Sequence, residues 1–440
     1  MKTLEENHTY GIDELIEYIG HGRFQHMLFF CCGLPFIADF AQIFINPFII
    51  PGIREEFHCS AFRASLIPSS LFVGMLTGSI LFGRLSDRIG RRPTFLLCLA
   101  CTGIFGASSA LCRSLWTLMM TRVLCGLGVG GFHVSMTLFS EYIPKQTRAA
   151  SLTLIQSFIS IGSITTCALA WAFHTYSWRL LTVICASISI LCAIPFYFLP
   201  ESARFLVRRG EISKARAILT RIAKQNGRTL PDAFTIESPA FIRPAELPAL
   251  FRNPTNRQLT IILCLLWYVA AFLYYGANFV SAQVVYGGNQ NAKVLLISLA
   301  EIASLLNTFA LSSRFGRRKA ISICGAVECL VLGVLLLRQY IGAMGTVLAM
   351  FAFRGLAASF VAIVCMFTAE AFPTVLRSTG FGVVSAFSRV GGICTPWISI
   401  AFAAMKFELA IAVYLVVLLL GSLCAMALPF ETRGRGMDES

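Results

Sequence analysis

Long runs of apolar residues, separated by short polar segments, account for most of the chain. Each run is about 20 residues or longer, which is enough to cross a hydrocarbon core of ~30 Å as a helix rising 1.5 Å per residue. The pattern predicts an all-α polytopic membrane protein with twelve transmembrane helices. The predicted spans are residues 27–50, 62–83, 94–112, 115–139, 150–172, 179–199, 258–285, 293–312, 320–338, 344–368, 379–403 and 408–428.

The composition supports a membrane protein and excludes several other classes. Hydrophobic residues make up 56% of the 440 residues and charged residues 13%, about half of the charged share of an ordinary soluble protein. A soluble fold of this length needs more charge to cover its surface, and a disordered chain would lack the apolar runs. No motif indicates a metal site, a cofactor, a nucleophile triad or an ATP-binding domain. We therefore expect no enzyme, no cofactor and no metal, and energy from a solute or proton gradient.

The net charge of +14 follows from where the basic residues lie relative to the membrane. If the N-terminus is cytosolic, the cytosolic segments hold 26 of the 36 Lys and Arg residues and the other side holds 7. This asymmetry obeys the positive-inside rule, so both termini are predicted to be cytosolic. The membrane topology thus explains the positive net charge, and a nucleic-acid partner is not expected.

The sequence also contains an internal repeat. Two blocks of six spans, residues 27–199 and 258–428, flank a polar central loop at 200–257, with cytosolic end segments at 1–26 and 429–440. Six spans per block give both halves the same orientation, and parallel repeats of this kind bind their solute near the midplane between the halves. Three features recur: Gly90-Arg91-Arg92 at Gly316-Arg317-Arg318, the segment Glu141–Arg148 at Glu370–Arg377, and Arg122 at Arg354.

Several motifs resemble those of the major facilitator superfamily. Residues 83–92 (GRLSDRIGRR) resemble its signature loop between the second and third helices, and residues 122–131 (RVLCGLGVGG) look like its fourth-helix motif. Residues 200–206 (PESARFL) and 429–435 (PFETRGR) resemble marks of the sugar-porter-like clan. The resemblance implies a carrier that moves a small solute by alternating access. Segments similar to the synaptic-vesicle-protein-related (SVOP-like) branch, itself similar to bacterial nicotinate carriers, are residues 22–25, 38–39, 271–276, 299–301 and 368–396.

Two acidic residues inside predicted spans are the candidates for proton coupling. Asp39 lies near the middle of the first span, and Glu301 lies in the eighth. An ionised carboxylate at such a depth costs at least ~2.5 kcal/mol, so each must face a polar cavity or a partner. The alternative for both is a structural, hydrogen-bonded acid, and a structural role is favoured for Glu328 in the ninth span.

Three arginines, Arg122, Arg354 and Arg389, also lie inside spans. Each needs a carboxylate, helix C-terminal carbonyls or an anionic solute as its partner. The resemblance implies a structural and coupling role for Arg122 near the first-helix acid, so we expect a contact between Asp39 and Arg122. Glu301 is expected to be protonated or paired with Arg354, which leaves Arg389 for an anionic solute; an ion pair of Arg389 with a buried acid is the alternative. The residues expected to contact the solute are Arg389, Gln42, Tyr275, Asn278 and Trp397.

A further group of residues is expected to control opening at the cytosolic face. Asp87 should accept hydrogen bonds from the N-terminus of the eleventh helix, which would join the halves there and favour the outward-open state. Contacts of Glu141 with Arg148, and of Glu370 with Arg377, are expected at the same face. The full gating and structural set is Asp87, Arg88, Gly90, Arg91, Arg92, Arg122, Glu141, Arg148, Arg354, Glu370 and Arg377.

Three smaller features have two interpretations each. The segment Gly126–Gly131 satisfies GxGxxG, but it lies inside a span, so we interpret its small residues as a close helix–helix contact. His133 is expected to be neutral and packed, with a protonatable relay as the alternative. Cys59 and Cys112 are expected to be free thiols, with a disulfide as the alternative.

Together these features predict a secondary active transporter of a small organic ion, with an organic anion favoured and protons as the coupled ion. Phe272, Tyr274 and Tyr275 in the seventh span offer aromatic surface for a flat ring. The alternatives are a facilitator for sugars or other uncharged solutes, and a membrane receptor that retains the fold without transport. The protein is expected to act as a monomer in the plasma membrane or an intracellular vesicle membrane.

Overall fold

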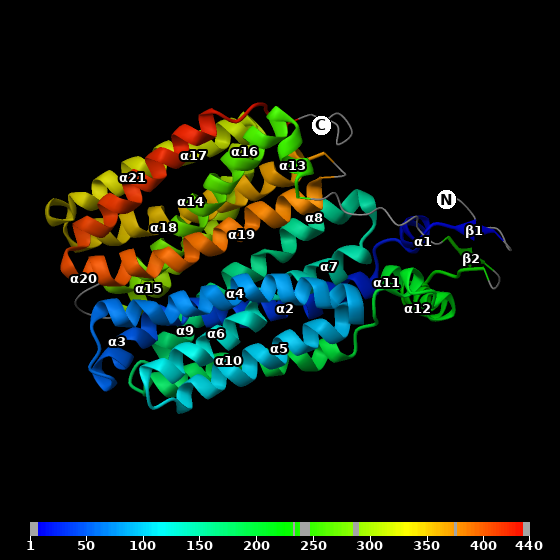
Figure 1. Ribbon diagram of the computed structural model, residues 1–440, viewed down its shortest axis with the longest axis horizontal. Coiled ribbons are helices and arrows are strands. Elements are labelled where there is room, and N and C mark those ends of the chain that lie inside the picture. The colour runs from blue at the N-terminus through cyan, green and yellow to red at the C-terminus, as the bar shows by residue number, and fades with distance from the viewer. Residues whose placement is uncertain (1–7, 232–233, 238–246, 285–289, 374–375, 434–440) are drawn as a thin grey trace.

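The computed structural model describes residues 8–231, 234–237, 247–284, 290–373 and 376–433. Twelve helical segments in these ranges are long and apolar enough to cross a membrane. They overlap all of the predicted spans, so the predicted fold class is confirmed. The two halves of the repeat form two helical bundles side by side, with α1, α11, α12 and α13 at one end and α3, α15 and α20 at the other (Figure 1).

The elements follow the repeat. The N-terminal half contains β1 (Thr9–Tyr10), α1 (Ile12–Ile19), α2 (Arg23–Phe44), α3 (Asn46–Glu56), α4 (Ala61–Ile89), α5 (Arg91–Ser108), the 3-10 turn η1 (Ser109–Leu111), α6 (Leu115–Gly130), α7 (His133–Glu141), α8 (Lys145–Ile155), α9 (Ser157–Ala172) and α10 (Trp178–Tyr197). The central segment adds α11 (Ala203–Arg208), α12 (Ile212–Gln225), β2 (Thr235–Ile236) and α13 (Ala249–Arg252). The C-terminal half contains α14 (Pro254–Val284), α15 (Gln290–Ser298), α16 (Ala300–Phe315), α17 (Arg317–Leu336), α18 (Arg338–Ala371), α19 (Arg377–Pro396), the π-helical turn η2 (Trp397–Phe402), α20 (Ala403–Met405) and α21 (Phe407–Met426).

The first transmembrane segment is divided where α2 passes into α3. Pro47 has no N–H group, so it cannot donate to the carbonyl of Ile43 one turn earlier. The side chain of Asn46 replaces that donor, because its Nδ2 lies 2.8 Å from the Ile43 carbonyl and 3.0 Å from the Gln42 carbonyl. With these carbonyls satisfied, the chain continues as α3 to Glu56, beyond the predicted end of the span at residue 50.

Helices α4 and α6 approach each other closely because glycines line their contact. A Cβ atom on Gly74 would lie 2.0 Å from the carbonyl oxygen of Val123, and one on Gly126 would lie 2.0 Å from that of Leu71. Such distances leave no room for any side chain at either position. The interpretation of Gly126–Gly131 as a helix–helix contact is therefore confirmed.

Gly126→Ala should destabilise the protein, whereas Gly83→Ala should not. The methyl group at residue 126 would collide with backbone atoms of α4, and overpacking of this kind costs about 1–3 kcal/mol. Gly83 is the matched control, because no atom lies within 4 Å of a Cβ added there. Thermal unfolding of the two purified variants makes the comparison, and equal melting temperatures would contradict the close contact.

We call the end that carries α1, α11 and α12 the terminal face and the other end the opposite face (Figure 1). At the terminal face β1 pairs in parallel with β2. Asp13 on α1 forms ion pairs with Arg204 of α11 and with Lys145 and Arg148 of α8. Partial burial acts to raise the pKa of Asp13, but these three cations outweigh that effect and hold the pKa below its ordinary value. The first described residues are thus tied to both the central segment and the start of the fifth span.

Candidate functional site

The two halves touch each other from the middle of the bundle to the opposite face. Helix α4 packs against α19 and η2, α14 packs against α3, and α15 packs against α9. The Oγ of Ser69 donates a hydrogen bond to the Ile393 carbonyl at 2.8 Å. The ring centroids of Phe72 and Tyr275 lie 4.6 Å apart. These contacts close the interface on the side of the opposite face.

At the terminal face, the ion pairs do not connect the two halves: among the described residues, no ion pair at that face joins the N-terminal half to the C-terminal half. The side chain of Asp87, which was expected to reach the other half, is 64% exposed. The structure therefore has the geometry of a carrier closed at its opposite face.

A buried ion pair lies where α15, α16 and α18 of the C-terminal half meet α9 of the N-terminal half. The Nη2 of Arg354 lies 3.0 Å from the Oε1 of Glu301, and both side chains are 1% exposed. Ser163 of α9 donates to the same oxygen at 2.8 Å and accepts from Arg354. Tyr274 donates to the other carboxylate oxygen at 3.3 Å. The cluster thus links the two halves through hydrogen bonds to one carboxylate.

Of the two expectations for Glu301, the structure has the ion pair with Arg354. Removing one member of a buried pair leaves the other charge uncompensated, which typically costs 3–5 kcal/mol. This arrangement gives Glu301 a structural role in the present conformation. Its carboxylate would be free to take up a proton only if Ser163 or Arg354 moved away.

Arg389 on α19 is a buried cation without an acidic partner. The residue is 7% exposed. Its Nη1 donates to the Oγ of Ser388 at 2.6 Å and to the Ser385 carbonyl at 3.4 Å. Its Cζ lies 5.5 Å from the ring centroid of Phe132 in the other half. Among the described residues, no carboxylate contacts the guanidinium, and no hydrogen bond involves its Nε or Nη2.

Two aromatic residues from different halves, Phe132 and Tyr275, lie near this cation. Phe132 packs edge-on against Phe36 and Phe40 of α2, with centroid distances of 5.7 and 6.2 Å. Tyr275 of α14 lies close enough to Arg389 to interact with it electrostatically. The region around Arg389 therefore combines one cation with flat apolar surface from both halves.

The structure brings together two of the five residues expected to contact the solute, Arg389 and Tyr275. The side-chain amide of Asn278 donates to the Tyr274 carbonyl of its own helix at 3.0 Å. Trp397 lies toward the opposite face, where its ring faces Phe62 at 6.3 Å. The ring of Trp397 therefore lies at the closed side of the interface, and the amide nitrogen of Asn278 is bound to the backbone of its own helix.

The expected contact between Asp39 and Arg122 is absent, and this expectation was wrong. The Nη1 of Arg122 donates instead to the Oε1 of Gln42 at 3.3 Å, and the Nε and Nη2 of Arg122 have no partner among the described residues. Gln42 lies one helical turn beyond Asp39 and is fully buried inside the N-terminal bundle. The structure thus assigns Gln42 to the support of Arg122 rather than to the solute.

Asp39 itself is 2% exposed, and among the described residues its carboxyl group forms no hydrogen bond and no ion pair. Cys98, Cys125 and Cys192 lie close enough to interact with it electrostatically. An ionised carboxylate in such surroundings is costly, and a protonated one costs much less. The geometry is therefore suited to a group that gains and loses a proton as its surroundings change.

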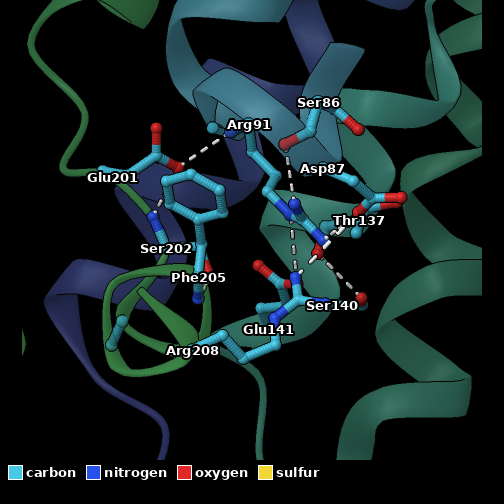
Figure 2. A network of polar contacts seen from close by, with 12 residues as sticks. Ser86, Asp87, Arg91, Thr137, Ser140, Glu141, Glu201, Ser202, Phe205 and Arg208 are labelled. Carbon is cyan, nitrogen blue, oxygen red and sulfur yellow. Dashed lines mark hydrogen bonds and ion pairs between the residues drawn. The ribbon is translucent and has the colours of Figure 1, made fainter. Parts of the chain in front are cut away.

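A polar network at the terminal face is centred on Arg91 at the start of α5 (Figure 2). Its Nη2 lies 3.0 Å from Asp87 and its Nε lies 3.4 Å from Glu141. Its Nη1 donates to the Ser86 carbonyl at 2.7 Å, and its guanidinium lies over the ring of Phe205. The network joins α4, α5, α7 and α11, all of which lie on the side of the N-terminal half.

Several expectations for this face need correction. Asp87 contacts Arg91 and Arg208 rather than the start of α19. Arg148 binds Asp13 rather than Glu141, because α1 brings a second carboxylate to the start of α8. Glu370 pairs with Arg317 at 3.0 Å; the side chain of Arg377 lies outside the described residues. Arg92 donates to the Tyr197 carbonyl, and Arg88 is exposed.

Two acids that the sequence analysis did not select hold the repeated loops in the same way. Gly90 and Gly316 have φ values of 107° and 82°, which favour glycine. Beside them, Glu201 accepts from the first backbone N–H of α5 at 3.0 Å, and Glu431 accepts from that of α17 at 2.7 Å. A carboxylate is favoured at a helix N-terminus. The sequence alone could have identified these two acids, because each follows the last span of its half.

Asp87→Ala should change how often the terminal face is open. The contacts of Asp87 in this conformation lie within the N-terminal side, so any contact with α19 would form only in the alternate conformation. The exposed contacts of Asp87 with Arg91 and Arg208 contribute little to this conformation. Loss of about 1 kcal/mol of contacts with α19 would therefore shift the two populations by about fivefold toward the conformation seen here. Labelling of cysteines introduced at each face measures the shift.

The control for this variant is Ser313→Ala in the equivalent loop of the second half. The Oγ of Ser313 donates only to the Ala310 carbonyl of its own helix, so its removal should leave labelling unchanged. Unaltered labelling at both faces in Asp87→Ala would show that Asp87 does not control the opening.

Two further sequence expectations concern residues away from the interface. Cys59 and Cys112 are both free thiols, as expected. Glu328 is fully buried on α17, and neither of its carboxyl oxygens has a hydrogen-bond partner among the described residues. The hydrogen-bonded role considered for such an acid is therefore not observed at this position.

Comparisons with known proteins agree with this architecture. The family model described as "Sugar (and other) transporter" matches residues 24–440. The "Synaptic vesicle 2-related protein" of Xenopus laevis is 31% identical over 98% of this chain and 83% of its own length. The "Organic cation/carnitine transporter 7" of Arabidopsis thaliana is 27% identical over 99% of this chain and 97% of its own length.

A solved structure has the same fold. The partially occluded inward-open conformation of the xylose transporter XylE from E. coli aligns with a TM-score of 0.75 and 16% sequence identity. The alignment covers 96% of this chain and 100% of that one. At this identity the likeness concerns the fold alone.

Proposed function

The chain belongs to the sugar (and other) transporter family of the major facilitator superfamily, in its SVOP-like branch, and from this premise we propose that it carries a small organic anion. Transport would be secondary active, coupled to protons and driven by alternating access. The halves at residues 27–199 and 258–428 would rock against each other about the solute. The solute would cross the membrane chemically unchanged.

The main support for an anionic solute is the guanidinium of Arg389, which has no acidic partner among the described residues. A buried cation without a counter-ion is costly inside a membrane, so the empty site would hold water or an inorganic anion. An organic carboxylate can replace that anion through two parallel hydrogen bonds to the planar guanidinium. The rings of Phe132 and Tyr275 beside it favour a solute that carries a flat apolar group.

Two acids were candidates for proton coupling, and the geometry favours Asp39 over Glu301. Glu301 is already paired with Arg354, whereas Asp39 has no partner among the described residues. A carboxyl group that is neutral in one conformation and ionised in the other carries one proton per cycle. In the alternate conformation Arg122, whose Nε and Nη2 lack partners here, could stabilise the ionised form.

The proposed orientation places the terminal face in the cytosol. The distribution of basic residues, 26 against 7 in favour of that side, supports this orientation. The conformation described here would then face the cytosol. We propose a monomer in the plasma membrane or a vesicle membrane; the name of the Xenopus relative supports the vesicle.

Two alternatives rest on the relatives' names. The Arabidopsis relative is named for organic cations and carnitine, and the E. coli structure is that of a xylose transporter. A sugar or a cationic solute would give the buried positive charge of Arg389 no anionic partner, unless the solute also carried a negative group. The unpaired guanidinium therefore favours the anion.

Uptake into proteoliposomes tests the proposal. Carboxylates, amines and sugars are offered separately, with and without a protonophore, across an imposed pH gradient. We expect accumulation of carboxylates that the protonophore abolishes. Accumulation of sugars or amines alone would favour the corresponding alternative, and binding without uptake of any class would favour a receptor.

A further inference from the structure

A second titratable group lies beside the proposed anion site, on the other half of the carrier. His133 is the first residue of α7, directly after the break between α6 and α7 at Gly131 and Phe132. Its ring lies against that of Phe132, with centroids 3.8 Å apart. Phe132 in turn lies against the guanidinium of Arg389. One aromatic ring therefore contacts both the imidazole on α7 and the guanidinium on α19.

Neither basic group has an anionic partner. His133 and Arg389 are close enough to interact electrostatically, and His133 is partly buried. Among the described residues, no hydrogen bond reaches the ring nitrogens of His133, and only the Nη1 of Arg389 is used as a donor. Both groups thus lie against the same ring at the interface between the halves, and among the described residues neither pairs with a carboxylate.

The charged groups on the elements packed against α7 lie elsewhere. These elements are α2, α4, α5 and α8. On α2, Asp39 interacts with cysteines of the N-terminal bundle rather than with the imidazole. Arg23 and His26 lie in the first turn of α2 at the terminal face, where the charged residues at the end of α4 and the starts of α5 and α8 also lie. Arg63 lies in the first turn of α4 at the opposite face. Arg389 is therefore the charged group that acts on His133.

We propose that His133 is the second side of the anion site and takes up one proton when the anion binds. In the empty carrier a protonated imidazole would be repelled by the guanidinium, so His133 is neutral. A carboxylate bound to Arg389 attracts a proton from solvent onto the free ring nitrogen of His133. The imidazolium then donates a hydrogen bond to the carboxylate, and the proton leaves when the anion leaves.

This arrangement determines what crosses the membrane with the solute. A monocarboxylate and the proton on His133 together carry no net charge, so their joint transfer moves no net charge across the membrane, whereas transfer of the anion alone would. The proton is separate from the one proposed for Asp39, because it follows the anion rather than the conformation. The anion also joins α7 of one half to α19 of the other.

Calorimetry on the purified full-length protein tests the inference, with benzoate as the probe and benzamide as its uncharged counterpart. The inference rests on the proposed anion function at Arg389. Titrations in two buffers of different ionisation enthalpy count the protons taken up per benzoate bound. We expect about one proton, and a Kd that rises by up to about tenfold per pH unit between about pH 6 and pH 8.

Variants locate the proton. In His133→Gln and His133→Asn, each checked for an unchanged melting temperature, benzoate should bind more weakly, without proton uptake and with a flat pH profile. In Arg389→Gln, benzoate binding should be lost at every pH. The wild-type proton count keeps the test decisive even if both histidine variants fail to fold.

The outcomes separate the inference from the function on which it rests. Benzoate binding that depends on Arg389 but takes up no proton, or takes up the same proton in His133→Gln, would overturn the role of His133 and leave the anion carrier standing. Equal benzoate binding by the wild type and Arg389→Gln would overturn both.

Discussion

Replacement of Arg389 by lysine should reduce uptake of an aromatic carboxylate by about tenfold to a hundredfold. A hydrogen bond between charged groups contributes about 1.5–3 kcal/mol, and each 1.4 kcal/mol is a factor of ten. Lysine keeps the charge but cannot form the two parallel hydrogen bonds of the planar guanidinium. Initial rates of uptake at subsaturating solute concentration measure the loss.

The matched control is Arg338→Lys at the opposite face. Arg338 pairs with Glu408 at 2.8 Å, with both side chains more than one third exposed, and exposed pairs contribute little. The same chemical change should therefore leave uptake near the wild-type rate. Wild-type uptake of carboxylates by Arg389→Lys would remove the guanidinium from solute recognition.

Asp39→Asn should abolish accumulation against a gradient while leaving exchange of internal for external solute. Asparagine resembles the protonated carboxyl group in shape, and no ion pair is lost, because Asp39 has none among the described residues. Exchange requires no net change of protonation, whereas accumulation does. Both processes can be measured in the same proteoliposomes, with and without a pH gradient.

Glu328→Gln is the matched control for this variant. Glu328 is as buried as Asp39, and among the described residues it also has no hydrogen-bond partner. It lies on α17, which packs against α18 and α21 away from the interface. Accumulation should survive this change. Undiminished accumulation in Asp39→Asn would exclude Asp39 as the coupling group.

The sequence predicted the fold well because the bilayer determines both the length and the composition of each span. The largest error in the first span arose at Pro47, where the helix was expected to end soon afterwards. The structure instead continues to Glu56, because the side chain of Asn46 supplies the hydrogen bond that the proline cannot. The local pattern of apolar and polar residues does not reveal that a side-chain amide replaces a missing backbone N–H donor.

Contacts between helices were harder to predict than the helices themselves. Gln42 and Asp39 lie one turn apart on α2, and the depth of α6 beside them decides which of the two meets Arg122. The structure selects Gln42. Similarly, nothing near Arg148 in sequence indicates that Asp13 on α1 would bind it, because that contact depends on how the terminal segment folds back onto α8.

Equivalent positions in the two halves share their place in the fold but not always their partners. The repeat correctly paired Arg122 with Arg354 as equivalent positions, yet the two have different partners: an amide for Arg122 and a carboxylate for Arg354. Comparison of the halves would also have selected Glu201 and Glu431, which hold equivalent helix starts. Equivalent positions therefore predict shared architecture more reliably than shared chemistry.

The most direct test of the central claim is calorimetric binding of a charge-matched series to the wild-type protein. Benzoate, benzamide and benzylamine share one ring and differ in charge, so their Kd values isolate the sign of the charge that the site prefers. The guanidinium of Arg389 predicts that benzoate binds most tightly and that benzylamine binds least. Tighter binding of benzylamine or benzamide than of benzoate would contradict an anion carrier.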